Sequence, residues 1–130
     1  MSESRPIRVL IAGQDNAFRA ELCRLIGYNS RIEVIAHANS GQEAVDLALA
    51  HHPDLVLMDM IIHGTNGLAA TRALKQQQPS IPVILFTILN EQEYLSVARY
   101  SGVDRCLNKR EIGRKLMPLI DSLTMPAPHH

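Results

Sequence analysis

Four short, nearly unbroken apolar runs recur along the chain, and they constrain its fold more than any other feature. They are Ile7–Ala12, Ile32–Ala38, Leu55–Asp59 and Pro82–Thr87. Runs of this length and composition are typical of β-strands that are covered on both faces. A weaker run, Val103–Leu107, predicts a fifth strand.

Segments with apolar residues at helical spacing follow each of these runs. The residues that outline these helices are Phe18, Leu22, Leu25 and Ile26; Ala44, Val45, Leu47, Ala48 and Leu49; Leu68, Thr71, Leu74 and Lys75; Tyr94, Leu95, Val97 and Ala98; and Ile112, Leu116, Leu119, Ile120 and Leu123. The helix ends are marked by the capping box Ser40 with Glu43, by the cap Asn90, and by Gly27, Pro53, Pro79 and Gly102. Pro118 predicts a kink or an early break in the last helix.

This strict alternation predicts an α/β fold, a parallel sheet with helices on both faces. In such a sheet the carboxyl ends of all strands lie along one edge, where ligands bind. The residues expected at that edge are Gly13, Gln14 and Asp15 after the first strand, Asp59 at the third, Thr87 at the fourth, and Asn108 and Lys109 after the fifth. A carboxylate, a hydroxyl and an ammonium from three strands are therefore predicted to converge on one site.

Composition narrows the class of protein. The 130 residues indicate one domain, and 13 Lys and Arg balance 13 Asp and Glu, so no global field favours nucleic acid or an anionic membrane. Cys23 and Cys106 form no CxxC motif, which favours a reduced, cytoplasmic protein. No apolar run approaches the roughly 20 residues of a membrane span. The chain has neither a GxGxxG nor a GxxxxGK[ST] loop, and its basic stretch at 109–115 lacks the aromatic or helix-turn-helix pattern of a nucleic-acid site.

The predicted site suits phosphoryl chemistry. Asp59 could act as a nucleophile toward phosphorus, Lys109 could offset the charge of the transferred group, and Thr87 could donate a hydrogen bond to it. Alternatively, Asp59 and Lys109 form a structural ion pair and Thr87 only ends a strand. The residues alone leave both interpretations open.

Four stretches, RVLIA, DLVLMDMIIHGTNGLAATR, PVILFT and LNK, resemble the receiver domain of response regulators, specifically the NarL/LuxR-type branch. The resemblance extends from about Arg5 to Leu123, so residues 1–124 are assigned to a receiver domain and 125–130 to a linker stub or an added tail. It implies a flavodoxin-like, doubly wound sheet of five parallel strands in the order 2-1-3-4-5. It also implies that Asp59 is the phosphoacceptor, that Thr87 and Lys109 sense the phosphoryl group, and that Gly67 opens the third helix.

The sequence departs from the family pattern directly after the first strand. The family carries two acidic residues there, which hold Mg²⁺ beside the phosphoacceptor, but this chain has Gly13 and Gln14. Because Mg²⁺ prefers carboxylate oxygens in an octahedral array, its binding is expected to be weak or absent, and no metal ligand is assigned. Asp15 is expected to cap the first helix, with a residual metal ligand as the alternative.

Three further positions differ from the family. Ile88 replaces a residue that is usually small and is expected to narrow the access of a phosphodonor. Cys106 replaces the aromatic switch residue and is expected to behave as a small buried hydrophobe, which puts the usual switching route in doubt. His63 replaces a loop proline and is expected on the surface.

These departures favour an atypical receiver, a pseudo-receiver that is not an enzyme and acts through dimerisation or partner binding by a helix face. The alternative is a phospho-switch that accepts phosphate on Asp59 from a sensor histidine kinase or acetyl phosphate. The resemblance implies that a DNA-binding output domain usually follows the receiver. Such an output domain is not in these residues. The chain is therefore expected to be either a fragment or a stand-alone receiver, and a role in transcription regulation is inferred from the family alone. No contact of this domain with nucleic acid or a membrane is expected.

Overall fold

The molecule is built on a five-stranded parallel sheet in the order β2-β1-β3-β6-β7. The computed structural model describes residues 5–88, 92–93 and 102–124. The strands are β1 (Ile7–Ala12), β2 (Ile32–Ala38), β3 (Leu55–Asp59), β6 (Val83–Thr87) and β7 (Arg105–Asn108). Since β6 and β7 are the fourth and fifth strands of this sheet, the predicted α/β fold and the order 2-1-3-4-5 are confirmed.

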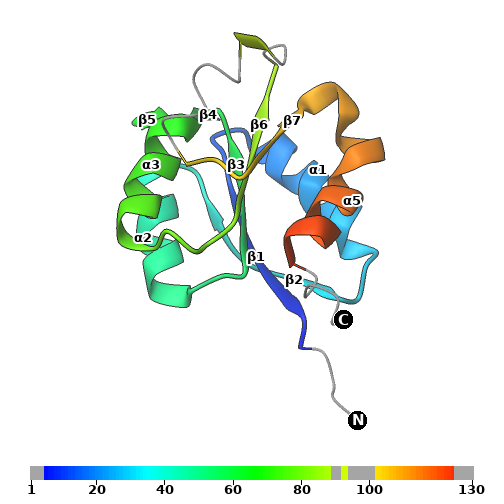
Figure 1. Cartoon of the computed structure of the whole chain (residues 1–130). Coiled ribbons are helices and arrows are strands. Elements are labelled where there is room, and N and C mark those ends of the chain that lie inside the picture. The colour runs from blue at the N-terminus through cyan, green and yellow to red at the C-terminus, as the bar shows by residue number, and fades with distance from the viewer. Residues whose placement is uncertain (1–4, 89–91, 94–101, 125–130) are drawn as a thin grey trace.

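Two helical layers cover the sheet (Figure 1). On one face lie α2 (Gly41–His51) and α3 (Gly67–Gln77), and on the other lie α1 (Asn16–Gly27) and α5 (Ile112–Thr124). Alternate strand residues point to opposite faces, so each layer closes its own apolar core. β3 and β6 are buried at every position, which explains their unbroken apolar composition. The predicted helix after Asn90 falls on residues 90–101, nearly all of them outside the described part of the chain.

Local signals account for most element boundaries. The Ser40 side chain accepts a hydrogen bond from the Glu43 amide at 3.1 Å, while the Glu43 carboxylate accepts one from the Asn39 amide at 2.8 Å. The capping box is therefore formed, with its return bond made one residue earlier than in the usual motif. The His52 backbone, left-handed with φ 48°, caps the other end of α2 directly before Pro53.

The structure differs from the sequence-based prediction in the loop after β3, at Pro118 and in the bounds of β7. The expected loop after β3 contains a short antiparallel hairpin of β4 (Ile61–Ile62) and β5 (Thr65–Asn66), whose two-residue strands are too short to give a periodic pattern. The predicted early break at Pro118 is wrong, because α5 continues to Thr124. Proline removes one backbone hydrogen bond, whereas Leu116 and Ile120 on either side of it are buried against the sheet.

Strand register sets the geometry of the carboxyl edge. Asp59 pairs with Phe86 across β3 and β6, and Thr87 pairs with Asn108 across β6 and β7.

The described residues contain no helix that is both long and apolar enough to span a membrane.

Candidate functional site at the carboxyl edge of the sheet

The site centres on Asp59, the last residue of β3, which is only 1% exposed. The Lys109 Nζ lies 2.9 Å from its Oδ1 and 3.0 Å from its Oδ2, so one ammonium group contacts both carboxylate oxygens. The Ile61 amide donates a further hydrogen bond to Oδ1 at 3.1 Å. Asp59 is therefore a buried carboxylate with a charged partner and a backbone donor.

Lys109 is positioned by both its backbone and an aromatic neighbour. It follows β7 at the first residue of the 3-10 helix η1 (Lys109–Glu111), where the Asn108 side chain caps the turn. Its Nζ lies 4.5 Å from the centroid of the Phe18 ring, a cation–π distance. Phe18 in turn packs edge to face on Phe86, with centroids 5.5 Å apart. Sequence reasoning assigned Phe18 only to a helix core, and its spacing carried no signal for this second role.

The two positions that carry the family's acid pair hold no acidic side chain. Gly13 is packed so closely against Asp59 that a Cβ on Gly13 would lie 3.0 Å from the Asp59 Cβ and 3.4 Å from Oδ2. Gln14 is partly exposed, and its backbone N–H donates to the Ile61 carbonyl at 3.4 Å. In the described residues no three His, Cys, Asp or Glu side chains are placed to hold a metal ion together. One carboxylate and one neutral amide do not fit the oxygen set that Mg²⁺ requires.

Asp15 lies at the start of α1 and forms its N-cap. Its Oδ1 accepts a hydrogen bond from the Ala17 amide at 2.9 Å, and its backbone is extended, as at an ordinary N-cap. The side chain is exposed. Arg19, one turn further along α1, donates to the Gly13 carbonyl and to the Asn16 side chain. The polar residues after β1 therefore form hydrogen bonds that stabilise the first turn of α1.

Gly67 opens α3 directly against the backbone of Asp59 and Met60. Its amide donates to the Met60 carbonyl at 2.8 Å, and an added Cβ would lie 2.4 Å from the Asp59 carbonyl oxygen. Only a glycine allows this approach without a shift of α3 or β3.

The remaining predicted positions occupy different parts of the edge. Thr87 is 2% exposed at the end of β6, next to Asn108 in register. Ile88 follows it with 68% of its surface exposed. Cys106 on β7 is partly buried, and His63 is exposed, with its carbonyl accepting from the Gly41 amide at 3.1 Å. The structure thus brings Lys109 and Gly13 each into contact with Asp59, whereas Asp15 caps α1.

A parallel sheet with a buried aspartate at the end of β3 and a lysine after β7 defines the fold and core of a receiver. The chain matches the response regulator receiver domain family over residues 9–121, and it belongs to this family. Its relatives and structural neighbours place it in the NarL/LuxR-type branch.

Three comparisons illustrate the relationship. The chain is 32% identical over 104 residues to the response regulator protein VraR of Staphylococcus saprophyticus, covering 80% of this chain and 50% of that protein. It is 29% identical over 109 residues to the nitrate/nitrite response regulator protein NarL of Escherichia coli K12, covering 84% and 50%. A LuxR-family response regulator structure from Aurantimonas sp. SI85-9A1 superposes with a TM-score of 0.86 at 24% identity, covering 92% of this chain and 85% of that one. The chain spans about half the length of the curated relatives it matches.

Proposed function

We propose that this receiver domain is atypical, acting through dimerisation or partner binding without magnesium-dependent phosphorylation of Asp59. The observation that carries the proposal is the replacement of the acid pair by Gly13 and Gln14, with the Gly13 backbone packed against Asp59. A phosphoryl transfer site relies on a metal ion to neutralise developing charge, a contribution of several kcal/mol. With one carboxylate left at the edge, that contribution is expected to be small or absent.

The charge balance of the site supports the same proposal. Three carboxylates and one lysine would leave an excess of negative charge, which a divalent cation would neutralise. Here Asp59 and Lys109 balance each other, and the lysine contacts both carboxylate oxygens. The edge therefore has no excess negative charge from this pair to attract a cation.

A second candidate function is a phospho-switch in which Asp59 accepts phosphate from a histidine kinase or from acetyl phosphate. It is favoured by the retention of Asp59, Thr87 and Lys109 at the matching strand ends. In the whole protein either form of receiver would control a DNA-binding output domain, as inferred from relatives that are named transcriptional regulators. The domain itself is proposed to have no catalytic role.

Intact-mass analysis after treatment with acetyl phosphate separates the two functions. The full chain and Asp59→Ala are incubated with acetyl phosphate, each with magnesium and with excess chelator. The atypical receiver predicts that the unaltered chain gains no phosphoryl adduct beyond any found in Asp59→Ala. An adduct that needs magnesium and disappears in Asp59→Ala would overturn the proposal and establish the phospho-switch. An adduct of equal extent in both chains would lie on another residue and would agree with the proposal.

A further inference from the structure

A cavity of about 550 Å³ lies between β7 and α5, and Thr87 and Asn108 at the carboxyl edge of the sheet form part of its lining. Its β7 wall includes Cys106 and Leu107, and its α5 wall includes Pro118 and Leu119. Small-molecule sites typically have volumes of roughly 300 to 1,000 Å³ and are mostly apolar, with a few polar groups. The cavity has both the size and the lining of such a site.

The small side chain of Cys106 explains part of the volume of this cavity. A thiol side chain stands on β7 where the family pattern has an aromatic ring, and it forms part of the wall of the cavity while remaining partly buried. The ring of a phenylalanine or tyrosine is several atoms larger than a thiol and would extend into the cavity from the same Cα. The exchange of a ring for a thiol therefore leaves a volume that a flat apolar molecule could fill.

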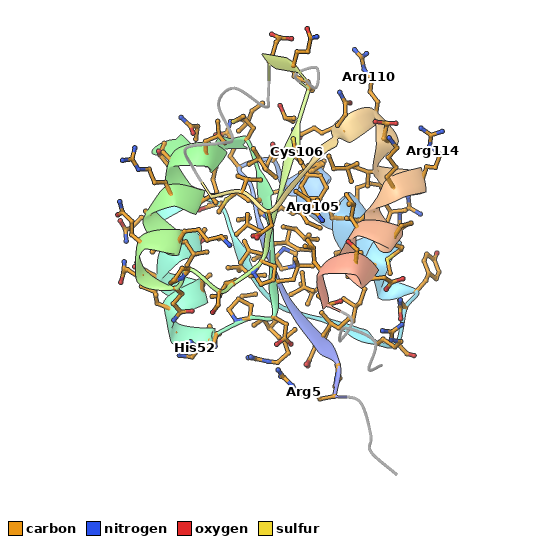
Figure 2. All side chains as sticks on the ribbon, in the orientation of Figure 1. Arg5, His52, Arg105, Cys106, Arg110 and Arg114 are labelled. Atoms are coloured by element: carbon orange, nitrogen blue, oxygen red, sulfur yellow. The ribbon has the colours of Figure 1, made fainter. Side chains whose placement is uncertain are left out.

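The charges at the rim favour an anion. Arg114 and Lys115 on α5 line the cavity together with Glu111, and both cations contact the same Glu111 oxygen, at 2.7 Å and 2.9 Å. These hydrogen bonds hold the pKa of the Glu111 carboxyl below its ordinary value. Two cations and one carboxylate leave one positive charge. Arg114 projects outward from α5 (Figure 2), and its fork of N–H donors suits a carboxylate or sulfonate that enters from solvent.

We propose that this cavity binds a small monoanionic acid with an aromatic body. The ring would lie against Cys106, Leu107 and Leu119, and the anionic group would lie at the rim beside Arg114 and Lys115. The bound molecule would also contact Thr87 and Asn108, the strand ends that precede Lys109 in the site. Binding requires no phosphorylation of Asp59, so the proposal stands independently of the state of that residue.

An NMR titration of the ¹⁵N-labelled full chain tests the proposal with 1-naphthoate as the anionic probe and 1-naphthamide as its neutral analogue. Saturable shifts of the Cys106, Leu107 and Leu119 amides are expected with naphthoate, and binding of naphthamide is expected to be about tenfold weaker. Non-saturable or dispersed shifts with naphthoate would overturn the site. Equal affinity for the two probes would overturn the anionic ligand class.

Variants locate the binding. Cys106→Phe is expected to weaken naphthoate binding at least about tenfold by filling the cavity, with folding checked by circular dichroism. Arg114→Gln with Lys115→Gln is expected to weaken it several-fold on a surface where folding is not at risk. Arg24→Gln is the matched control, because Arg24 forms the same i,i+3 pair with Glu21 on α1, away from the cavity. Unchanged affinity in both the filling and the charge variants would overturn the proposal.

Cys106 also provides a direct reporter of occupancy. Saturating naphthoate is expected to slow alkylation of Cys106 by iodoacetamide, while alkylation of Cys23, which lies on α1 and packs partly buried against the core, keeps its rate. Equal slowing of both thiols, or of neither, would contradict binding in this cavity.

Discussion

At the residue scale, the effect of neutralising Asp59 depends on how many charges share the site. In a site with three carboxylates, loss of one charge relieves repulsion between like charges. In this chain the Asp59 carboxylate has Lys109 as a balancing partner at 2.9 Å. Replacing Asp59 by Asn would leave Lys109 facing a neutral amide in a partly buried position. The sign of the resulting stability change therefore shows whether the site holds a balanced ion pair or several carboxylates.

Asp59→Asn is therefore expected to lower the free energy of unfolding. The expected loss is about 2 kcal/mol, below the roughly 3 to 5 kcal/mol of a fully buried pair, because the Lys109 side chain is 24% exposed. Urea unfolding measures it. Asp15→Asn makes the same chemical change at an exposed N-cap, where Asn caps as well as Asp, and should leave stability nearly unchanged. A gain in stability in Asp59→Asn would contradict the balanced pair.

Gly67→Ala tests the close approach of α3 to β3. The added Cβ would lie 2.4 Å from the Asp59 carbonyl oxygen and 2.7 Å from Leu85 Cδ1, so α3 or β3 must shift. The expected loss of stability is about 1 to 3 kcal/mol, measured by thermal and urea unfolding. Gly113→Ala on α5 is the control, since its Cβ would meet open space, and it is expected to gain up to about 1 kcal/mol. Equal effects at both glycines would refute the steric explanation.

Several residues of the site could be predicted from the sequence because strand topology alone brings them to one edge. Asp59, Thr87 and Lys109 each end or follow an apolar run, and parallel pairing places those ends together. The contact of Gly13 with Asp59 and the position of the Phe18 ring over Lys109 could not be predicted. Both depend on side-chain packing across β1, β3 and α1, which no linear spacing reports.

At the scale of elements, prediction succeeded where an apolar run is bounded by polar residues, even for β2, which is mostly exposed or half-buried. The bounds of β1, β2 and β3 match the apolar runs to the residue, because each run ends where the polar edge begins. β7 runs from Arg105 to Asn108, later than the predicted Val103–Leu107, since this edge strand is only partly apolar. The break predicted in α5 failed because a local rule about proline was weaker than packing of α5 on the sheet.

Pro118→Ala measures how much the helix loses by holding a proline. The substitution restores a backbone donor in the interior of α5, where Pro118 lies seven residues into a continuous helix. We expect a gain of up to about 3 kcal/mol in the free energy of unfolding. Hydrogen exchange should show a protected amide at residue 118. A loss of stability without a protected amide would mean that the proline ring is needed for packing beside the cavity.

At the scale of the whole molecule, the described residues form a receiver fold whose edge has Gly13 and Gln14 in place of the family's acid pair. The two cores and the strand order depend on apolar burial and not on the chemistry of the edge, so the fold persists when those acids are replaced. The proposed partner-binding role is compatible with this separation, because it needs the fold and not the acids of the edge. Whether the site takes magnesium is therefore the central question about the molecule.

A magnesium titration followed by NMR answers that question most directly, using the full chain beside Gln14→Asp and the double variant Gly13→Asp with Gln14→Asp. The Gly13 substitution must displace the Asp59 side chain slightly, so Gln14→Asp alone is the gentler restoration. The account predicts no saturable shifts near Asp59 in the unaltered chain at millimolar magnesium, and saturable shifts in the double variant. Saturable shifts of the Asp59, Met60 and Gly13 amides in the unaltered chain would contradict it.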